Sequence, residues 1–323
     1  MVGSVLVAMG AGALSLLAAA TVERERVQLD RYRVQLNSRH LPSHGLTILH
    51  LSDFHFKADG LVQARKIANL QALLAQEHYD VVALTGDLIH DIDGLPAALA
   101  LIESLRPRYG LYFVPGNHDY AEYTPWGVFG HTWRESADGD TGARDWLQVV
   151  GALLEFAGKV ARNDLVRMPV RFNDVPGILH QLSAIGVQPL VNEPARLTAD
   201  DVDVWFSGVD DALEGRCDLA AALGDIPAGA PLVLLAHNPD IWLQDGVDRA
   251  DLVLSGHTHG GQIQLPVMGA VHTQGTHLRR GQPAGWFERG TSRMFVSRGL
   301  GESIPLRFRA RPQATLIHLV GSK

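Results

Sequence analysis

The chain has 323 residues, of which 46% are hydrophobic and 20% are charged, and its formal net charge is −7. This composition is typical of a globular protein with a sizeable core, and it excludes a disordered or low-complexity chain. The acidic balance argues against nonspecific binding to nucleic acid, which needs a basic surface, so we expect no nucleic-acid partner.

An uncharged apolar stretch opens the chain and runs from Val2 to Val22. About 20 such residues span the core of a bilayer, so residues 1–22 are predicted to form a transmembrane anchor. A cleaved signal segment is the alternative, because Ala18-Ala19-Ala20 offers the small residues of a cleavage site. The arginines that follow favour a cytoplasmic catalytic domain by the positive-inside rule, whereas a signal segment implies export. The side of the membrane therefore stays open.

A charged stretch over residues 23–45 follows, and we interpret it as a linker with one short strand at 32–36. Beyond it, apolar runs alternate with helical patterns from 46 to 323, which predicts one α/β domain. Helices are expected over residues 61–77, 95–105 and 175–185. Strands are expected at the apolar runs 47–51, 81–84, 111–114, 232–235, 252–254 and 294–297.

Five short motifs of metal-binding residue types each follow one of these predicted strands. They are Asp53-Phe54-His55, Gly86-Asp87, Gly116-Asn117-His118-Asp119, His237 and Gly256-His257-Thr258-His259. Loops after the carboxyl ends of strands are where α/β sheets bind ligands. Carboxylate, amide and imidazole groups in this number suit two adjacent divalent ions, so the joint order of the motifs predicts a two-metal site. Most of the other histidines, including His90, are interpreted as surface residues, and His50 as a core residue.

This arrangement resembles the calcineurin-like metallophosphoesterase superfamily, and within it the bacterial YkuE/YaeI-like phosphoesterases. The segments that carry the resemblance are Leu51-Ser52-Asp53, Gly116-Asn117-His118-Asp119-Tyr120, His237-Asn238-Pro239-Asp240, Ser255-Gly256-His257-Thr258-His259-Gly260-Gly261-Gln262 and Ser297-Arg298-Gly299-Leu300-Gly301. The resemblance implies a four-layer αββα sandwich from about residue 46 to the end, preceded here by an N-terminal hydrophobic helix. It also implies that the strand-rich part from 253 to 319 contributes to the second sheet.

The resemblance assigns a role to each motif residue. Asp53, His55 and His259 would bind the first metal. Asn117, His237 and His257 would bind the second metal. Asp87 would bridge the two ions, which in such hydrolases lie about 3.5–4 Å apart and activate a shared water as hydroxide. The ligand set has no thiolate, which leaves Mn²⁺, Fe and Zn²⁺ open, with Mn²⁺ preferred.

Three further residues have roles outside the ligand set. His118 is expected to protonate the leaving group as a general acid. Asp119 either orients His118 or caps the loop, and the sequence does not decide between these two roles. Arg298 would bind a substrate phosphate or, alternatively, form a structural ion pair with an acidic neighbour.

Residues 121–173 form an insertion relative to the pattern of these phosphoesterases. The insertion starts beside His118, so we expect a cap over the site. Its residues 145–160 predict a helix with an apolar stripe. That stripe would pack on the catalytic core or, alternatively, touch a membrane or an acyl chain.

The predicted function is metal-dependent hydrolysis of a phosphodiester or pyrophosphate at a membrane, with a lipid-linked phosphoester as one candidate substrate. A lipid-nucleotide hydrolase similar to UDP-diacylglucosamine pyrophosphatase is a specific alternative. A catalytically idle metal-binding scaffold of the cell envelope is the rival from another class. The intact ligand set and His118 argue against that rival, and the acidic charge argues against a nuclease.

Overall fold

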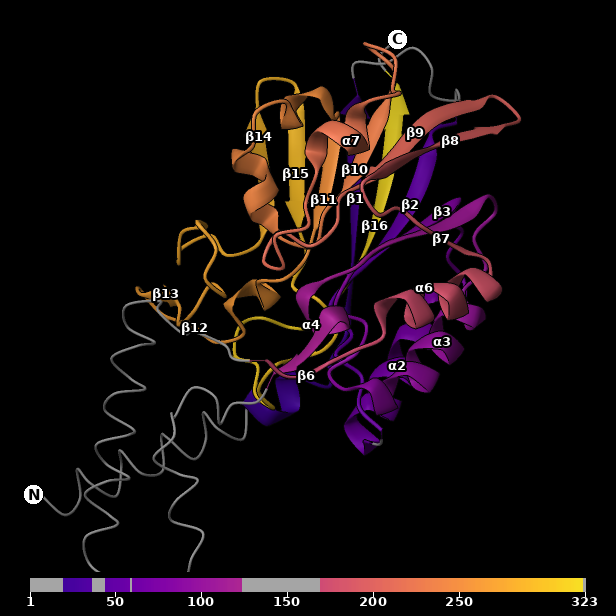
Figure 1. Cartoon of the computed structure of the whole chain (residues 1–323). Helices are drawn as coiled ribbons and strands as arrows, with labels where there is room; N and C mark the ends of the chain where they lie inside the picture. The colour runs from indigo at the N-terminus through magenta and orange to yellow at the C-terminus, as the bar shows by residue number, and fades with distance from the viewer. Residues whose placement is uncertain (1–19, 37–43, 59, 124–168, 322–323) are drawn as a thin grey trace, which may run out of the picture.

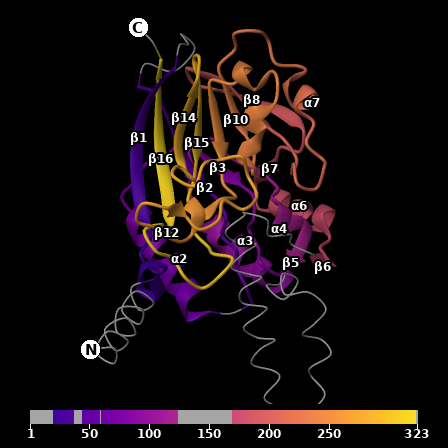
Figure 2. The same cartoon turned by 90° about the vertical axis from the view of Figure 1, so that its left-hand side faces the viewer.

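Two six-stranded sheets stack face to face in the computed structural model, which describes residues 20–36, 44–58, 60–123 and 169–321. The first sheet has the order β1-β16-β2-β3-β4-β7, and β16 runs antiparallel to β2 while the other neighbours are parallel. Its strands are β1 (Gln28–Leu36), β2 (Leu46–Leu51), β3 (Val81–Thr85), β4 (Gly110–Val114), β7 (Val187–Pro189) and β16 (Gln313–Gly321). Figures 1 and 2 show β1 and β16 side by side along one edge.

The second sheet has the order β14-β15-β11-β10-β9-β8, with four parallel central strands and an antiparallel strand at each edge. Its strands are β8 (Glu193–Ala199), β9 (Val202–Gly208), β10 (Leu232–Leu235), β11 (Leu252–Ser255), β14 (Gly285–Arg289) and β15 (Ser292–Val296). Two small two-stranded sheets lie outside both large sheets. They are β5 (Ala121–Tyr123) with β6 (Pro169–Phe172), and β12 (Gln264–Leu265) with β13 (Gly269–Ala270).

Helices cover the outer face of each sheet and complete the four layers. Three helices pack on the first sheet and are grouped in Figure 1: α2 (Leu61–Leu74), α3 (Leu95–Ser104) and α6 (Val175–Ala184). The second sheet is covered by α7 (Leu219–Leu223), η4 (Pro239–Leu243) and η5 (Val247–Arg249). The other short helices, η1 (Ile92–Gly94), α4 (Asn117–Tyr120) and η6 (His259–Gly261), lie in loops. The predicted αββα sandwich is therefore confirmed.

Alternating side chains explain why the central strands are apolar throughout. In β2, Ile48 points into the core between the sheets, while Leu49 and Leu51 point into the core under the helices. Successive side chains of a strand face opposite sides, and strands covered on both faces therefore need apolar residues at nearly every position. His50 is the buried exception in β2, whose other polar residue, Thr47, is half-buried. His50 is fully buried, as expected for a core residue, and its Nε2 bonds the Thr85 hydroxyl at 2.8 Å, while its Nδ1 has no hydrogen-bond partner among the described residues.

Two strands differ from the sequence-based expectation. The short strand expected at 32–36 extends from Gln28 to Leu36 and pairs with β16, so this part of the expected linker belongs to the first sheet. The last strand, β16, also joins the first sheet rather than the second, because it pairs with β1 and β2. The reason is long-range pairing, which the local apolar pattern does not encode.

Two expected elements lie largely outside the described residues. Of the predicted anchor, residues 1–22, the structure describes only the last three, and no helix within the described ranges combines the length and the hydropathy that a bilayer span requires. Of the insertion, only its two ends are described. They pair as β5 and β6, directly after α4, which carries His118. The expected cap and its helix at 145–160 fall between them.

Candidate metal centre

The predicted ligands all lie in loops that follow strands of the two sheets. Five of them adopt left-handed backbone conformations, with φ of 51° at Asp53, 47° at His55, 53° at Asp87, 71° at His257 and 52° at His259. Such φ values are uncommon for residues with a side chain, and they cost free energy that the surrounding structure must supply. Their concentration in these loops marks a functional site, because the backbone is held in this form to aim the side chains.

Two glycines keep the ligand loops in close contact. A Cβ at Gly86, whose φ is +77°, would lie 2.6 Å from the backbone nitrogen of Gly116. A Cβ at Gly116 would lie 2.4 Å from Oδ1 of Asp87. The loops after β3 and β4 therefore touch backbone to backbone, which only glycine permits at these positions.

Three of the predicted ligands form a first triad. Asp53, His55 and His259 are buried, and one potential ligand atom from each lies within 4.8 Å of the others. Nε2 of His259 lies 3.8 Å from Oδ1 of Asp53. These are the residues that the sequence predicts around the first metal.

A second triad consists of Asp87, His237 and His257, again buried and again within 4.8 Å. Oδ2 of Asp87 lies 3.3 Å from Nε2 of His237. The same oxygen lies 3.3 Å from Nε2 of His55, which belongs to the first triad. Asp87 therefore stands between the triads, where a bridging carboxylate would have to be.

Hydrogen bonds orient three of the imidazoles. Backbone carbonyls only accept hydrogen bonds, so the ring nitrogens facing them must be donors. Nδ1 of His237 lies 2.8 Å from the Thr85 oxygen, Nε2 of His257 lies 3.2 Å from the Gln274 oxygen, and Nδ1 of His259 lies 3.2 Å from the Gly301 oxygen. The opposite nitrogen of each ring is then left as an acceptor that faces the site, an arrangement typical of metal-binding histidines.

The resulting arrangement of lone pairs fits a cation. Nε2 of His237 and Nδ1 of His257 are only 3.1 Å apart, although the carbonyl bonds make both of them acceptors in neutral rings. Asn117 is 1% exposed, and its Oδ1 accepts no hydrogen bond from any residue of the described ranges. Two acceptors facing each other, and an acceptor without a donor such as Oδ1 of Asn117, are costly to bury. A divalent ion would satisfy them, so the residues present fit the metals that the sequence predicts.

The electrostatics of the site agree with that fit. Burial raises the pKa of Asp53. Burial acts to lower the pKa of His237, but the charge of Asp87 outweighs it and raises that pKa to about 10. Burial acts to raise the pKa of Asp87, but the charges of His237 and His118 hold it well below its usual value. The negative charge of Asp87, which favours a proton on His237, would also favour a cation between these residues.

His118 lies beside the first triad without belonging to it. Its ring centre is 4.5 Å from that of His55 and 4.9 Å from that of Tyr123. Its backbone N–H donates to Oδ1 of Asp87 at 2.8 Å, which fixes the start of α4 against the proposed bridge. The residue is 2% exposed, and its predicted role as the leaving-group acid stays a prediction.

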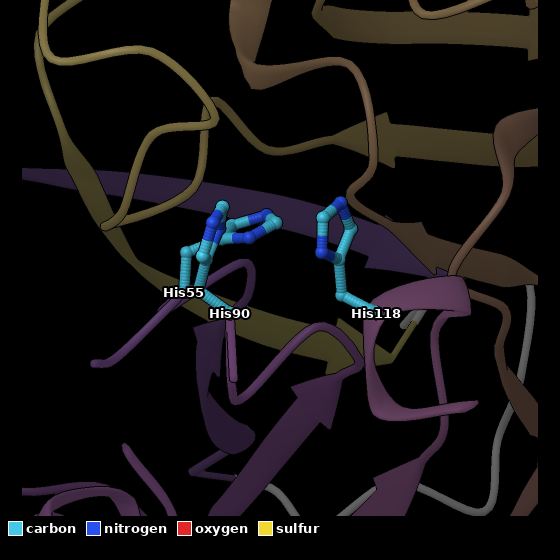
Figure 3. Close-up of side chains that lie close together, drawn as sticks. All are labelled: His55, His90 and His118. Carbon is cyan, nitrogen blue, oxygen red and sulfur yellow. The ribbon is translucent and has the colours of Figure 1, made fainter. Parts of the chain in front are cut away.

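His90 was not predicted as a site residue, yet it joins His55 and His118 in a three-histidine cluster (Figure 3). Its ring stacks on that of His118 at 5.5 Å between ring centres. The backbone N–H of His90 donates to the Phe56 oxygen at 2.8 Å, which turns the loop after β3 toward the site. The surface interpretation of His90 is therefore corrected: the residue is half-buried at the site. The sequence feature that could have identified His90 as a site residue is its position three residues after the predicted ligand Asp87.

Asp119 holds loops together rather than touching a reacting group. Its carboxylate accepts the backbone N–H groups of Asp87 at 2.8 Å, Leu88 at 2.9 Å and Gly116 at 2.9 Å. Burial, together with the charge of Asp87, raises its pKa to about 7. Of the two interpretations left open by the sequence, these contacts support the loop-capping one.

Arg298 is engaged in structural contacts. Its Nη2 lies 3.2 Å from Oδ2 of Asp30 in β1, and its Nε donates to the Arg311 oxygen at 3.0 Å. These contacts favour pairing with an acidic neighbour over the binding of a substrate phosphate. The predicted role in substrate binding stays a prediction, which the following variants test.

We expect Arg298→Ala and Asp30→Ala to destabilise the fold while leaving KM for a phosphodiester within about twofold, because the pair joins the loop after β15 to β1. A double-mutant cycle by urea unfolding should give a coupling free energy of about 1 kcal/mol. A large rise in KM for Arg298→Ala, with no loss of stability, would instead make Arg298 a substrate ligand.

Arg307 is a second residue that the sequence did not single out. It is fully buried, and its guanidinium donates to the oxygens of Ala310 at 2.7 Å, Arg298 at 2.9 Å and Gly301. Burial lowers its pKa to about 10. Because the Gly301 oxygen also binds His259, Arg307 fixes the loop that orients this ligand. No sequence motif predicts this role of Arg307, because its hydrogen-bond partners are backbone oxygens.

Comparisons with known proteins agree with this geometry. Residues 46–261 match the family model for calcineurin-like phosphoesterases. The metallophosphoesterase YkuE of Bacillus subtilis is 27% identical over 85% of this chain and 79% of its own length. UDP-2,3-diacylglucosamine pyrophosphatase LpxG of Chlamydia muridarum is 26% identical over 92% of this chain and 90% of its own. Phosphodiesterase YaeI of Escherichia coli is 31% identical over 43% of this chain and 50% of its own.

The family match covers most of the chain and all of the proposed ligands, from Asp53 to His259. It agrees with the two-sheet architecture and with the clusters of histidine and aspartate that this architecture brings together. Phosphoester hydrolysis and divalent-metal binding follow from the family at this coarse level. The chain belongs to the calcineurin-like phosphoesterase family.

Proposed function

We propose that the chain hydrolyses a phosphodiester or pyrophosphate with two divalent ions held by seven residues. They are Asp53, His55, Asp87, Asn117, His237, His257 and His259. The observation that carries the proposal is the position of Asp87, whose Oδ2 lies 3.3 Å from nitrogens of both triads. A carboxylate shared in this way brings two metals close enough to act on one phosphate.

The side chains around the metals have separate tasks. When bound, the ions would supply an activated water and neutralise the charge of the phosphate. Asp87, held by the His118 backbone, would keep the two binding triads at a fixed separation. His118 would donate a proton to the oxygen of the departing group, which leaves as a neutral alcohol or a protonated phosphate. Hydrolysis then needs no covalent intermediate on the protein.

Manganese is the preferred metal in this proposal, with iron or zinc as alternatives. The proposed ligands are carboxylate and amide oxygens and imidazole nitrogens, without thiolates, and this set suits all three metals. The preference for manganese rests on the hard oxygen ligands, and reconstitution of metal-free protein with each ion would test it.

The substrate is proposed to be lipid-linked and the protein to act at a membrane. One relative is a UDP-2,3-diacylglucosamine pyrophosphatase by name, which makes a nucleotide-lipid pyrophosphate the specific alternative for this chain. The uncharged stretch from Val2 to Val22 also supports membrane association, either as a retained anchor or, if it is a signal segment, through export.

An exposed apolar hairpin gives further support for contact with a membrane. Between β12 and β13, Val267 is fully exposed and Met268 is 64% exposed. The hairpin lies close to the first described residues, because Gln264 donates to the Phe308 oxygen while Arg307 donates its backbone N–H to the Ala20 oxygen. The hairpin tip and the end of the apolar stretch thus share one region of the molecule, and a lipid surface that receives the stretch would meet the tip.

A fluorescent label at the hairpin tip should report this contact. In a full-length Cys217→Ser background, Met268→Cys labelled with a polarity-sensitive dye should shift its emission to the blue when anionic liposomes are added, because the dye enters an apolar medium. Asp201→Cys, in the turn between β8 and β9, is the control, since Figure 1 shows that turn far from β12 and β13. Protein that co-sediments with liposomes without any shift at position 268 would exclude the hairpin from the membrane.

Assays with purified protein test the proposed activity. With Mn²⁺, the protein should hydrolyse bis-p-nitrophenyl phosphate faster than p-nitrophenyl phosphate, and EDTA should abolish the reaction. The absence of turnover with Mn²⁺, Fe²⁺ and Zn²⁺ on both compounds and on a nucleotide pyrophosphate would refute the proposal. An idle metal-binding scaffold would then be the better account.

A further inference from the structure

A cavity of about 190 Å³ adjoins the metal centre on the side of His55. It lies between the loop after β2, the start of α2 and the loop after β15. The polar side chains that decide its chemistry are Arg24, His55, Lys57, Lys66, Glu302 and Ser303. Neither the proposed ligands nor His118 account for this space, so its chemistry needs a separate explanation.

The charged residues of the cavity are mainly basic. Arg24, Lys57 and Lys66 line it, and Glu302 is the one acidic residue among the described residues of its wall. Glu302 is shared among three cations: it bonds the buried Lys66 amine, and it lies 3.8 Å from Nε of Arg307 and 3.9 Å from Nη1 of Arg24, which also donates to the Pro305 oxygen. Among the described residues of its wall, the cavity therefore has three cations against one carboxylate, in a chain whose net charge is −7. Such a concentration of cations favours an anionic ligand.

The start of α2 adds to this positive field. Gly60, Val62 and Gln63, at the start of the helix, line the cavity, and the first turn contains no acidic residue. The N-terminus of a helix attracts anions through its backbone N–H groups and its dipole. Gln63 also fastens the loop before the helix, since its Oε1 accepts the Lys57 N–H at 3.0 Å. The start of α2 and Lys57 are therefore held together in the wall of the same cavity.

The cavity reaches the first metal triad. His55, a proposed ligand, forms part of its wall. Ser303, also in the wall, has its hydroxyl 3.4 Å from Nε2 of His259, the nitrogen that would bind the metal. A molecule bound to the metals through one anionic group would therefore have a second, basic compartment directly beside it.

We propose that this cavity binds a second phosphoryl group of the substrate, next to the phosphoryl that is cleaved. Lys57 and Arg24 would bind its oxygens, and the first turn of α2 would face it. The proposal rests on the proposed function and narrows it to substrates with two adjacent phosphoryl groups, that is, pyrophosphate esters. Charge-assisted hydrogen bonds from lysine and arginine supply the selectivity.

Two competitive inhibitors distinguish binding in the cavity from binding to the metals. Methylphosphonate carries one anionic group and needs only the metals, whereas methylenediphosphonate carries two and would also fill the cavity. We expect Lys57→Gln to raise the inhibition constant of methylenediphosphonate about tenfold and that of methylphosphonate less than about twofold. Arg65→Gln is the matched control. It removes an exposed charge from the neighbouring surface of α2, paired with Glu25, and should change neither constant. Both inhibitors are measured with manganese in excess, so that their chelation of free metal cancels between variants.

The outcomes are distinct. Equal weakening of both inhibitors by Lys57→Gln, or no weakening of either, would overturn the proposal. The Arg24→Gln variant provides a second test, because it should show the same selective loss. If the wild-type protein hydrolyses no phosphoester, the proposed function fails, but calorimetry with the same two phosphonates on the wild type and Lys57→Gln still decides whether the cavity binds the second group.

Discussion

Asp87→Asn is expected to lower kcat/KM for bis-p-nitrophenyl phosphate at least about a thousandfold and to reduce the bound metal below two ions per chain. Oδ2 of Asp87 contacts His55 in one triad and His237 in the other. An amide in its place is neutral and offers one acceptor, so it cannot bridge two cations as a carboxylate does. Elemental analysis and steady-state kinetics on the same preparation measure both effects.

A matched variant checks that the loss is specific to the bridge. Asp251→Asn makes the same chemical change at a partly buried aspartate, whose Oδ2 accepts the Leu232 N–H at 2.9 Å. The amide oxygen of asparagine can still accept that bond, so both metals and activity should remain. If Asp87→Asn keeps two metals and near-normal turnover, the bridging assignment is wrong.

His118→Ala is expected to slow the hydrolysis of esters with poor leaving groups by about 10²-fold or more, while both metals stay bound. Alkoxide leaving groups need a proton, whereas nitrophenolate is stable without one, so nitrophenyl esters should lose much less. The measurement is the dependence of kcat/KM on the pKa of the leaving group, which should steepen in the variant.

His90→Ala is the control for this effect. His90 stacks on His118 in the same cluster, so this variant shows whether the loss of a neighbouring histidine has the same effect as the loss of His118. We expect a smaller loss without dependence on the leaving group. An equal loss of His118→Ala on good and poor leaving groups would remove His118 as the acid. A steepened dependence in His90→Ala would transfer that role to His90.

The positions of the ligands were predictable because they depend on local patterns. Each apolar run that predicted a strand became one, and Asp53, Asp87, Asn117, His237 and His257 follow strands as expected. Parallel strands bring their carboxyl ends to one side of a sheet, so residues at these ends meet without further information. Metal chemistry then selects among the residues, because carboxylate, amide and imidazole groups together are uncommon in an ordinary loop.

Long-range pairing and backbone contacts were not predictable in this way. The pairing of β16 with both β1 and β2 joins residues from distant parts of the chain, and no local pattern states which sheet receives it. Arg307 binds backbone oxygens, which every sequence offers. His90 lacked a motif of its own, and its approach to His118 follows from the pairing of its loop with Phe56.

Titration of metal-free protein with Mn²⁺, followed by electron paramagnetic resonance, shows whether the chain binds two ions joined by Asp87. Two ions joined by the Asp87 carboxylate would be exchange-coupled, so we expect a stoichiometry of two per chain, a coupled spectrum at saturation, and activity that rises with the second ion. Saturation at one ion per chain, with the spectrum of isolated Mn²⁺ and full activity, would contradict this expectation.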